Sequence, residues 1–338
     1  MAEVAQVPLQ GGRVIPNLCL PVTAAVQGKS SMYDLIGDIH GNADELIRLL
    51  EALGYEKAQG VYRHPERKVI FLGDFIDRGP KIREALEVVR PMVEAGHALA
   101  IMGNHELNAL AYYTEDPEEP GQYLRRRNPK NDKQIRKTVE QLNPQELRSY
   151  LEWCRTLPLW LDLKGLRVIH ACWDEVAIAQ IAAALEEHGG VTTSFLRSAC
   201  RKGNALFHPV EVILKGREAK LPDGLSFHDS GGNVRTEIRT RWYLSPRGQT
   251  YRTYALHSEA IPCDLTIDES VIQAATSYPT TAKPVFFGHY WLSDKRPELL
   301  AENVACIDYG QTRGFLCGYR WNGEQTLSNA NFVWVQGD

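Results

Sequence analysis

Residue types that could bind metal ions or transfer protons are concentrated in three short motifs in the first third of the chain. The motifs are Gly37-Asp38-Ile39-His40-Gly41, Gly73-Asp74-Phe75-Ile76-Asp77-Arg78-Gly79 and Gly103-Asn104-His105-Glu106. Each motif follows a short apolar run and precedes a segment with helical spacing. The polar residues therefore gather where strands end and helices begin, which is where open α/β folds place their sites. Carboxylate, amide and imidazole groups together suit a site for two divalent metal ions.

The segments around these motifs predict the elements that position them. Apolar runs predict strands at residues 33–36, 68–72 and 97–102, and helical spacing predicts helices at 43–53 and 81–93. Gly54 stands where a helix C-cap would be, and Pro91 indicates a stop or a kink near the end of the second helix. Strands that alternate with helices predict a layered α/β domain.

The alternation of predicted strands and helices continues on both sides of an irregular region, residues 174–282. A charged, turn-rich region, residues 115–134, precedes predicted helices at 135–141, 145–154 and 175–187 and a strand at 166–170 that ends in His170. Between residues 174 and 282 the rhythm weakens, although the alternation at 234–243 predicts one strand with arginines on one face. Strands return at 284–287, 304–307 and 315–321, and the first two end in Gly288-His289 and Asp308.

Composition restricts the class of protein. The chain has 338 residues, of which 43% are hydrophobic and 24% charged, values typical of a globular protein with a sizeable core. A net charge of −4 argues against general nucleic-acid binding. No apolar stretch is long enough to span a membrane, and no signal peptide is recognisable at the N-terminus. The seven cysteines are scattered without a Cys-x-x-Cys pair, which favours reduced thiols and a cytoplasmic location.

The motifs resemble those of the calcineurin-like metallophosphoesterase superfamily, and most closely its phosphoprotein-phosphatase branch. The match continues at His170 and at Gly288-His289, and it covers residues 32–175 and 283–325. The ending, residues 285–291 and 305–310, looks like that of bacterial symmetrical diadenosine tetraphosphate hydrolases. The resemblance implies a β-sandwich flanked by helices, formed by residues 31–175 and 283–338. A cap of residues 176–282 would be inserted in it, after an N-terminal arm of residues 1–30.

The resemblance also implies a ligand set for two metal ions. The first metal would be held by Asp38, His40 and Asp74, and the second by Asp74 together with three further side chains: Asn104, His170 and His289. Asp74 would bridge them, because one carboxylate offsets the repulsion of two cations about 3.5–4 Å apart. Mixed carboxylate and imidazole ligands favour Mn²⁺, with Fe or Zn²⁺ as alternatives. A hydroxide that bridges the metals would then attack phosphorus.

The same resemblance assigns the remaining catalytic roles. Arg78 would bind the phosphate oxygens, and His105 would protonate the leaving oxygen while Asp77 holds its other ring nitrogen. A second substrate arginine is common in this branch, and Arg239 and Arg241 are candidates for it. One departure from the branch is Trp173, a bulky residue close to His170, which is expected to reshape that side of the site.

Several alternatives stay open at this point. The substrate could be a nucleotide polyphosphate or a phosphoprotein carrying phospho-Ser/Thr or phospho-Tyr, and a non-catalytic scaffold is the alternative from another class. The run of residues 125–127, three arginines, could bind a substrate but more often would be a solvated loop. Cys172 and Cys306 are interpreted as small buried hydrophobes. The oligomeric state is not predicted.

Overall fold

Two β-sheets form the centre of the protein. The computed structural model describes residues 32–228, 232–257, 261, 264–275, 277–292, 296–309 and 315–337, so the predicted N-terminal arm lies outside the described residues. The larger sheet has the order β15-β14-β1-β4-β5, and its strands are β15 (Phe332–Val335), β14 (Leu316–Trp321), β1 (Met32–Ile36), β4 (Arg67–Phe71) and β5 (Ala98–Ala100). The smaller sheet has the order β13-β12-β7-β6, formed by β13 (Val304–Cys306), β12 (Val285–Phe287), β7 (Arg167–Ile169) and β6 (Trp160–Asp162).

The parallel strands of both sheets bring their carboxyl ends to one edge. In the larger sheet β1 and β4 run parallel with Leu35 opposite Ile70, and β5 continues in the same direction. In the smaller sheet β12 runs parallel to both β7 and β13. Most residues of these strands are apolar and buried, as expected for strands covered on both faces, and the charged exceptions are Asp34, Arg67, Lys68 and Arg167. The loops that follow β1, β4, β5, β7 and β12 therefore all start at buried, fixed positions.

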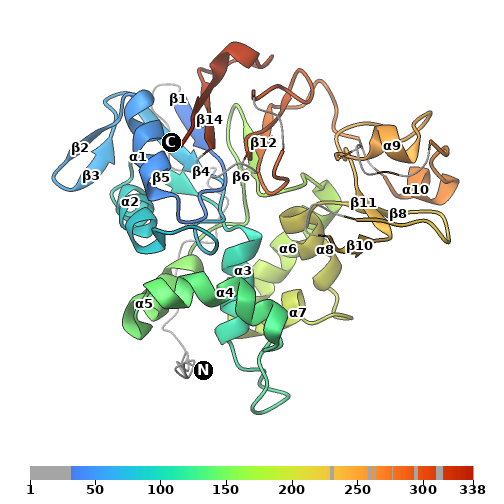
Figure 1. Cartoon of the computed structure of the whole chain (residues 1–338), viewed down its shortest axis with the longest axis horizontal. Helices are drawn as coiled ribbons and strands as arrows, with labels where there is room; N and C mark the ends of the chain where they lie inside the picture. The colour runs from blue at the N-terminus through green and yellow to red at the C-terminus, as the bar shows by residue number, and fades with distance from the viewer. Residues whose placement is uncertain are drawn as a thin grey trace.

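The two sheets pack against each other through aromatic side chains. Phe286 of β12 and Tyr319 of β14 have ring centres 5.0 Å apart, and Gly165 lies against the ring of Trp321 so closely that an added Cβ would be 2.6 Å from it. Figure 1 shows the sheets in the upper half of the molecule and most of the helices below. The predicted α/β sandwich flanked by helices is confirmed.

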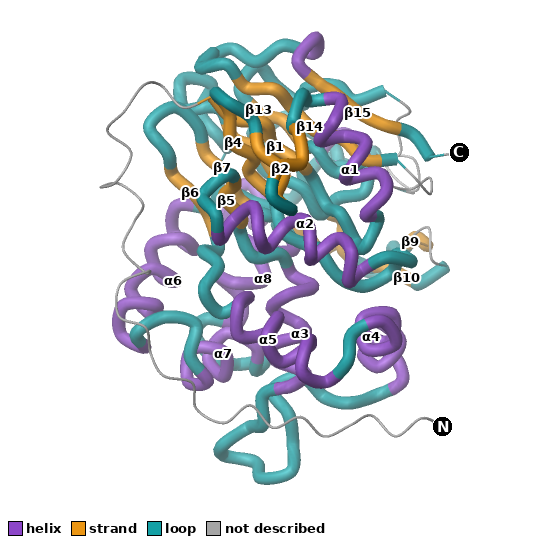
Figure 2. The backbone as a smooth tube through the Cα atoms, turned by 90° about the vertical axis from the view of Figure 1, so that its left-hand side faces the viewer, coloured by secondary structure: helices purple, strands orange, loops and turns teal. Residues whose placement is uncertain are grey.

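Helices cover the sheets and form a group below them, as Figures 1 and 2 both show. The helices are α1 (Ala43–Ala52), α2 (Ile82–Glu94), α3 (Asn104–Tyr113), α4 (Pro129–Gln141), α5 (Pro144–Cys154), α6 (Glu175–His188), α7 (Thr193–Cys200), α8 (Phe207–Lys215), α9 (Tyr251–Tyr254) and α10 (Glu269–Ala274), with a 3₁₀ turn at Asn329–Asn331. Local signals explain several boundaries: Asn143 caps α5 and exchanges hydrogen bonds with Glu146. Helix α2 continues to Glu94, so Pro91 does not end it. No helix among the described residues is long and apolar enough to cross a membrane.

The middle of the chain contains a second, smaller hydrophobic cluster. Strand β8 (Glu218–Lys220) pairs with β11 (Glu237–Arg239), and their buried residues Ala219 and Ile238 pack with Tyr251 of α9. Another pair, β9 (Phe227–His228) and β10 (Val234–Arg235), lies beside them, and a last pair, β2 (Glu56–Ala58) and β3 (Val61–Arg63), precedes β4. The single strand predicted at 234–243 is thus wrong, because β10 and β11 belong to different sheets.

Helices α6, α7 and α8 belong to the main core rather than to this second cluster. Their buried residues Ile181, Phe195 and Ile213 join the same continuous core as the strands of both sheets. The predicted cap of residues 176–282 includes these helices, so its boundaries stay a prediction.

Candidate metal centre

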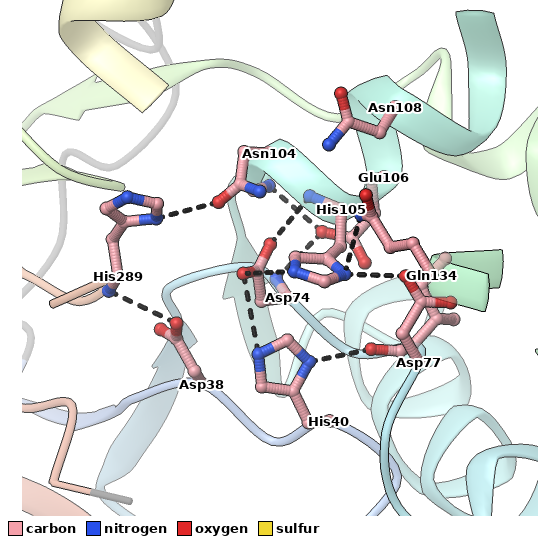
Figure 3. Close-up of polar contacts among 12 residues, drawn as sticks. Asp38, His40, Asp74, Asp77, Asn104, His105, Glu106, Asn108, Gln134 and His289 are labelled. Carbon is pink, nitrogen blue, oxygen red and sulfur yellow. Dashed lines mark hydrogen bonds and ion pairs between the residues drawn. The ribbon is translucent and has the colours of Figure 1, made fainter. Parts of the chain in front are cut away.

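The six predicted metal ligands converge on one place at the common edge of the two sheets. Asp38 and His40 follow β1, Asp74 follows β4, and Asn104 is the first residue of α3, directly after β5. His170 follows β7, and His289 follows β12. Figure 3 shows Asp38, His40, Asp74, Asn104 and His289 directed toward one another from these separate loops.

The carboxylate of Asp74 lies at the centre of this group. Its Oδ2 is 3.5 Å from His170 Nε2, 3.6 Å from His40 Nε2 and 3.9 Å from His105 Nε2. Burial alone would raise the pKa of Asp74, but the nearby imidazoles, His170 first, bring it well below its usual value. Two ligand atoms about 2.1 Å from a shared ion at a near-tetrahedral angle are roughly 3.4 Å apart. The spacing around Asp74 Oδ2 therefore fits a ligand that shares cations with its neighbours.

Further candidate ligand atoms lie close to His170 and His289. Asn104 Oδ1 is 2.7 Å from His289 Nδ1 and 3.1 Å from His170 Nε2, and Asp38 Oδ2 accepts a hydrogen bond from the backbone N–H of His289 at 3.1 Å. Asp38 Oδ1 and His289 Nε2 are buried and have no hydrogen-bond partner among the described residues. Buried polar atoms without partners are costly, so these two atoms fit a site that a cation completes.

The close neighbours divide into two triplets that share Asp74. One triplet is His40, Asp74 and His105, and the other is Asp74, His170 and His289, with the candidate atoms of each triplet within 4.8 Å of one another. Burial, followed by the charge of Asp308, raises the pKa of Asp38 well above its usual value. Burial and then the charge of Arg239 lower the pKa of His289. Burial alone would lower the pKa of His170, but the charge of Asp74 raises it to about 10. The acidic and imidazole groups of this buried cluster therefore interact strongly, and a bound divalent cation would change that balance.

Backbone strain is concentrated in the loops that carry these residues. Seven non-glycine residues among those described have positive φ, and six of them lie in the motif loops: His40 (46°), Asp74 (51°), Asp77 (68°), Arg78 (58°), His289 (71°) and Trp291 (54°). Such conformations cost of the order of 1–3 kcal/mol each when sparsely populated, and they cluster at functional sites. The fold therefore stabilises these loops through contacts made elsewhere.

Glu106 makes such stabilising contacts with the motif loops, although no role was predicted for it from the sequence. Its buried carboxylate accepts hydrogen bonds from the backbone N–H groups of Asp74 (2.7 Å), Phe75 (2.9 Å) and Gly103 (3.0 Å), and from the Tyr150 hydroxyl (3.1 Å). The loops after β4 and β5 are thus joined through one side chain. Gly73 and Gly103 allow this approach, since an added Cβ on Gly73 would lie 2.4 Å from the nitrogen of Gly103.

We expect Glu106→Gln to destabilise the protein by about 1–3 kcal/mol, the cost of a buried polar group left without a partner. Whichever way the new amide is turned, its NH₂ group faces at least one backbone N–H that Glu106 now accepts. Urea unfolding with metal chelated measures this loss, and the exposed Glu66→Gln is the control. Equal stability of the two variants would contradict the role given to Glu106.

The residues predicted to act in catalysis surround this centre. His105 Nδ1 is 2.6 Å from Asp77 Oδ2, so its Nε2 remains directed toward Asp74. Arg78 is exposed, and its guanidinium carbon lies 4.1 Å from the centre of the Trp291 ring. The geometry thus pairs His105 with Asp77 as predicted and adds Trp291 as a partner of Arg78 that the sequence did not indicate.

The two cap arginines occupy different environments. Arg239 lies 6.0 Å from the ring centre of Tyr290, and its charge acts on neighbouring His289. The Arg241 side chain instead donates to the backbone carbonyl of Ala255 at 3.2 Å. The structure therefore places Arg239 near the site and ties Arg241 to the cap backbone.

Three other predictions have mixed outcomes. The Trp173 ring, which was expected to reshape the site, instead has the Arg167 guanidinium 4.6 Å from its centre and donates a hydrogen bond to Glu175. In the arginine run, residues 126 and 127 are exposed, as expected for a solvated loop, whereas Arg125 is half-buried and donates to Asn108 and Gln134, both at 2.8 Å. Cys172 and Cys306 are buried free thiols whose pKa burial raises, in agreement with a packing role.

Asp308 is a neighbour of the site that was predicted to end a strand but was given no role from the sequence. It is buried behind Asp38, and its Oδ2 accepts the backbone N–H of Trp291 at 2.7 Å. Burial raises the pKa of Asp308 to about 6. A signal was present, because Asp308 follows a strand as the other acidic residues do, but no ligand motif surrounds it in the sequence.

Comparison with known proteins agrees with this geometry. The family profile of calcineurin-like phosphoesterases matches residues 33–215, more than half of the chain. The chain belongs to the calcineurin-like phosphoesterase family. This family match includes three of the strand-end motifs and His170, but it ends before β12 and His289.

Curated relatives of this calcineurin-like phosphoesterase match parts of it. An asymmetrical bis(5′-nucleosyl)-tetraphosphatase, PrpE of Halalkalibacterium halodurans, is 45% identical over 74 residues, which are 22% of this chain and 30% of that protein. PrpE of Oceanobacillus iheyensis is 32% identical over 139 residues, which are 41% of this chain and 54% of that protein. The match therefore spans about a third to a half of these relatives' length.

Solved structures with similar chains include two phosphatases. The cold-active protein-tyrosine phosphatase of a Shewanella species has 17% identity and a TM-score of 0.48, covering 86% of this chain and 75% of that one. A protein serine/threonine phosphatase of Saccharomyces cerevisiae has 12% identity and a TM-score of 0.47, covering 91% of this chain and 80% of that one.

Proposed function

We propose that this protein is a dinuclear-metal phosphoesterase that hydrolyses phosphoanhydrides or phosphate monoesters. The observation that carries the proposal is the buried carboxylate of Asp74, which lies 3.5–3.9 Å from three imidazole nitrogens contributed by three different loops. These distances are longer than ordinary hydrogen bonds, so hydrogen bonding alone does not account for three histidines around one buried aspartate. Two cations would use these atoms, with Asp74 shared between them.

The proposed function gives each residue of the site a role in metal binding or in catalysis. Asp38, His40 and Asp74 would hold one metal, and Asp74, Asn104, His170 and His289 the other. The metals, once bound, would supply Lewis-acid activation of the phosphoryl group and of water. Arg78, exposed at the edge of the site, would bind phosphate oxygens with its planar guanidinium. His105, oriented by Asp77, would donate a proton from Nε2 to the leaving oxygen.

Among phosphorylated substrates, we favour nucleotide polyphosphates over phosphoproteins. The support is the naming of the curated relatives as asymmetrical bis(5′-nucleosyl)-tetraphosphatases, which match the part of the chain that carries the first motifs. Mn²⁺ is the proposed activating metal, because mixed carboxylate and imidazole ligands suit it, and Fe or Zn²⁺ are the alternatives. A cytoplasmic location is part of the same proposal, supported by the free thiols of the described cysteines.

A substrate panel with Mn²⁺ tests this proposal. We expect diadenosine tetraphosphate to give the highest kcat/KM, above nucleoside phosphates, phosphopeptides and p-nitrophenyl phosphate, and chelation to abolish the activity. ATP with AMP as products would indicate asymmetrical cleavage, whereas two ADP would indicate symmetrical cleavage. Preference for phosphopeptides would establish the phosphoprotein alternative. A metal-loaded protein inactive on every substrate would refute the proposal and favour the scaffold alternative.

Arg239 is proposed to contact the part of the substrate beyond the reacting phosphate. Arg239 is close enough to the site for its charge to lower the pKa of His289. We therefore expect Arg239→Ala to raise KM for the nucleotide about tenfold, in line with the loss of a hydrogen bond to a charged group. The KM for p-nitrophenyl phosphate should change much less. Arg241→Ala is the matched control, since Arg241 bonds to Ala255. Equal losses on both substrates would instead place Arg239 at the reacting phosphate or in the fold.

A further inference from the structure

One face of α4 is polar and yet packs inward against the loop of the second motif. Gln134, Thr138 and Gln141 recur at helical spacing, so they lie on the same side of the helix. Each of the three side chains forms a hydrogen bond or a close contact with the second motif loop or with His105. Polar side chains turned toward the interior of a helix packing surface need a specific partner, and here the partners include Asp77 and the backbone just after Arg78.

Thr138 forms hydrogen bonds with both the carboxylate and the backbone N–H of Asp77. The Thr138 side chain is fully buried, its hydroxyl donates to Asp77 Oδ1 at 2.6 Å, and its oxygen accepts the backbone N–H of Asp77 at 3.1 Å. The other oxygen of Asp77 accepts a hydrogen bond from His105 Nδ1 at 2.6 Å. Asp77, with its positive φ of 68°, is thus fixed between Thr138 and His105. With both carboxylate oxygens engaged, its rotamer is fully specified.

The two glutamines of α4 complete this arrangement. Gln134 Nε2 lies 3.2 Å from His105 Nδ1, and Gln134 Oε1 accepts from Arg125. Because that ring nitrogen already donates to Asp77, the Gln134 amide packs beside the imidazole without donating a hydrogen bond to it. Gln141 donates to Gly79 O at 3.0 Å and accepts from the backbone N–H of Ile82 at 2.7 Å, which fixes the chain just after Arg78. Figure 3 shows Gln134 beside His105 and Asp77.

We propose that α4 positions the proton donor and that Thr138 is the positioning residue for the Asp77–His105 pair. By occupying Asp77 Oδ1, Thr138 keeps Oδ2 directed at His105 Nδ1, so that Nε2 stays free for the leaving oxygen. This inference rests on the proposed phosphoesterase function. It goes beyond that function because it assigns catalysis-supporting work to a helix outside all the recognised motifs.

The test compares Thr138→Val, which keeps the shape and removes the hydroxyl, with Thr138→Ser, which keeps the hydroxyl. We expect T138V to lower kcat on an alkyl phosphate about tenfold or more, with much less loss on p-nitrophenyl phosphate, and T138S to retain most of the activity. In a His105→Asn background, T138V should change kcat by less than about twofold, because the two residues act as one unit. The exposed Lys137→Ala on the same helix is the control.

The possible outcomes separate this inference from the function on which it rests. An active wild-type enzyme in which T138V costs the same factor on both leaving groups, or the same factor with and without His105, would overturn the role of Thr138 alone. Wild-type protein without phosphoesterase activity would overturn the proposed function instead. If T138V does not fold, T138S and Thr138→Ala carry the same comparison, since both lack the methyl group and differ only in the hydroxyl.

Discussion

Asp74→Asn should bind metal at less than two ions per chain and lose kcat by about a thousandfold or more. The physical reason is that one negative charge would serve two cations, so that its removal weakens both sites together. Metal ions contribute several kcal/mol to such reactions, and each 1.36 kcal/mol is a tenfold change in rate. Because Asp74 Oδ1 accepts the backbone N–H of His105 at 2.9 Å, the new NH₂ group would face the three imidazoles in place of Oδ2.

Elemental analysis and Mn²⁺ titration of the purified protein measure this effect. The wild-type chain should saturate at about two metals, and His289→Ala should weaken mainly one of them, because His289 belongs to only one of the two triplets. Asp116→Asn serves as the control: Asp116 is buried and paired with Arg201 outside the site, so the variant should lose stability and keep its metals. Saturation of the wild type at one metal, or two tightly bound metals in D74N, would contradict the shared site.

The sequence predicted that the candidate metal ligands lie at one edge of the sheets, because each one follows a short buried strand. Apolar runs specify strands locally, and the carboxyl ends of parallel strands meet at one edge, so Asp38, Asp74 and Asn104 could be expected to converge. His170 and His289 could not be assigned in this way, because a lone histidine at a strand end is more often a packing residue. The order of the motifs, rather than the physics of either histidine, indicated their role.

The contacts that hold the loops could not be predicted, because they join residues far apart in the chain. Thr138 and Asp77, which form a hydrogen bond, are 61 positions apart in the chain. Asp308 accepts a hydrogen bond from the backbone N–H of Trp291, which follows a neighbouring strand. No periodicity marks such pairs, since each depends on how helices and sheets pack. The strand predicted at 234–243 failed for a related reason: alternation predicts an extended chain, but not which partner each half of it will find.

The triplet of His40, Asp74 and His105 leaves a choice between two roles for His105. Its Nε2 is 3.9 Å from Asp74 Oδ2, which would permit a metal ligand, while the 2.6 Å contact of Nδ1 with Asp77 fits a proton donor. A ligand and a donor differ in what their removal does. Loss of a ligand removes a metal and affects every substrate, whereas loss of a donor matters in proportion to the basicity of the leaving group.

His105→Asn should therefore keep both metals and nearly the same KM, and lose kcat by about 10²–10⁴-fold on an alkyl phosphate. The loss on p-nitrophenyl phosphate should be much smaller, because nitrophenolate is a weak base that leaves without a proton. Single-turnover rates on both substrates, with metal content measured on the same samples, decide the matter. If H105N loses a metal, His105 is a ligand, and the Asp77–His105 pair is part of the metal centre. If H105N keeps both metals but loses the same factor on both substrates, His105 is not the source of the proton.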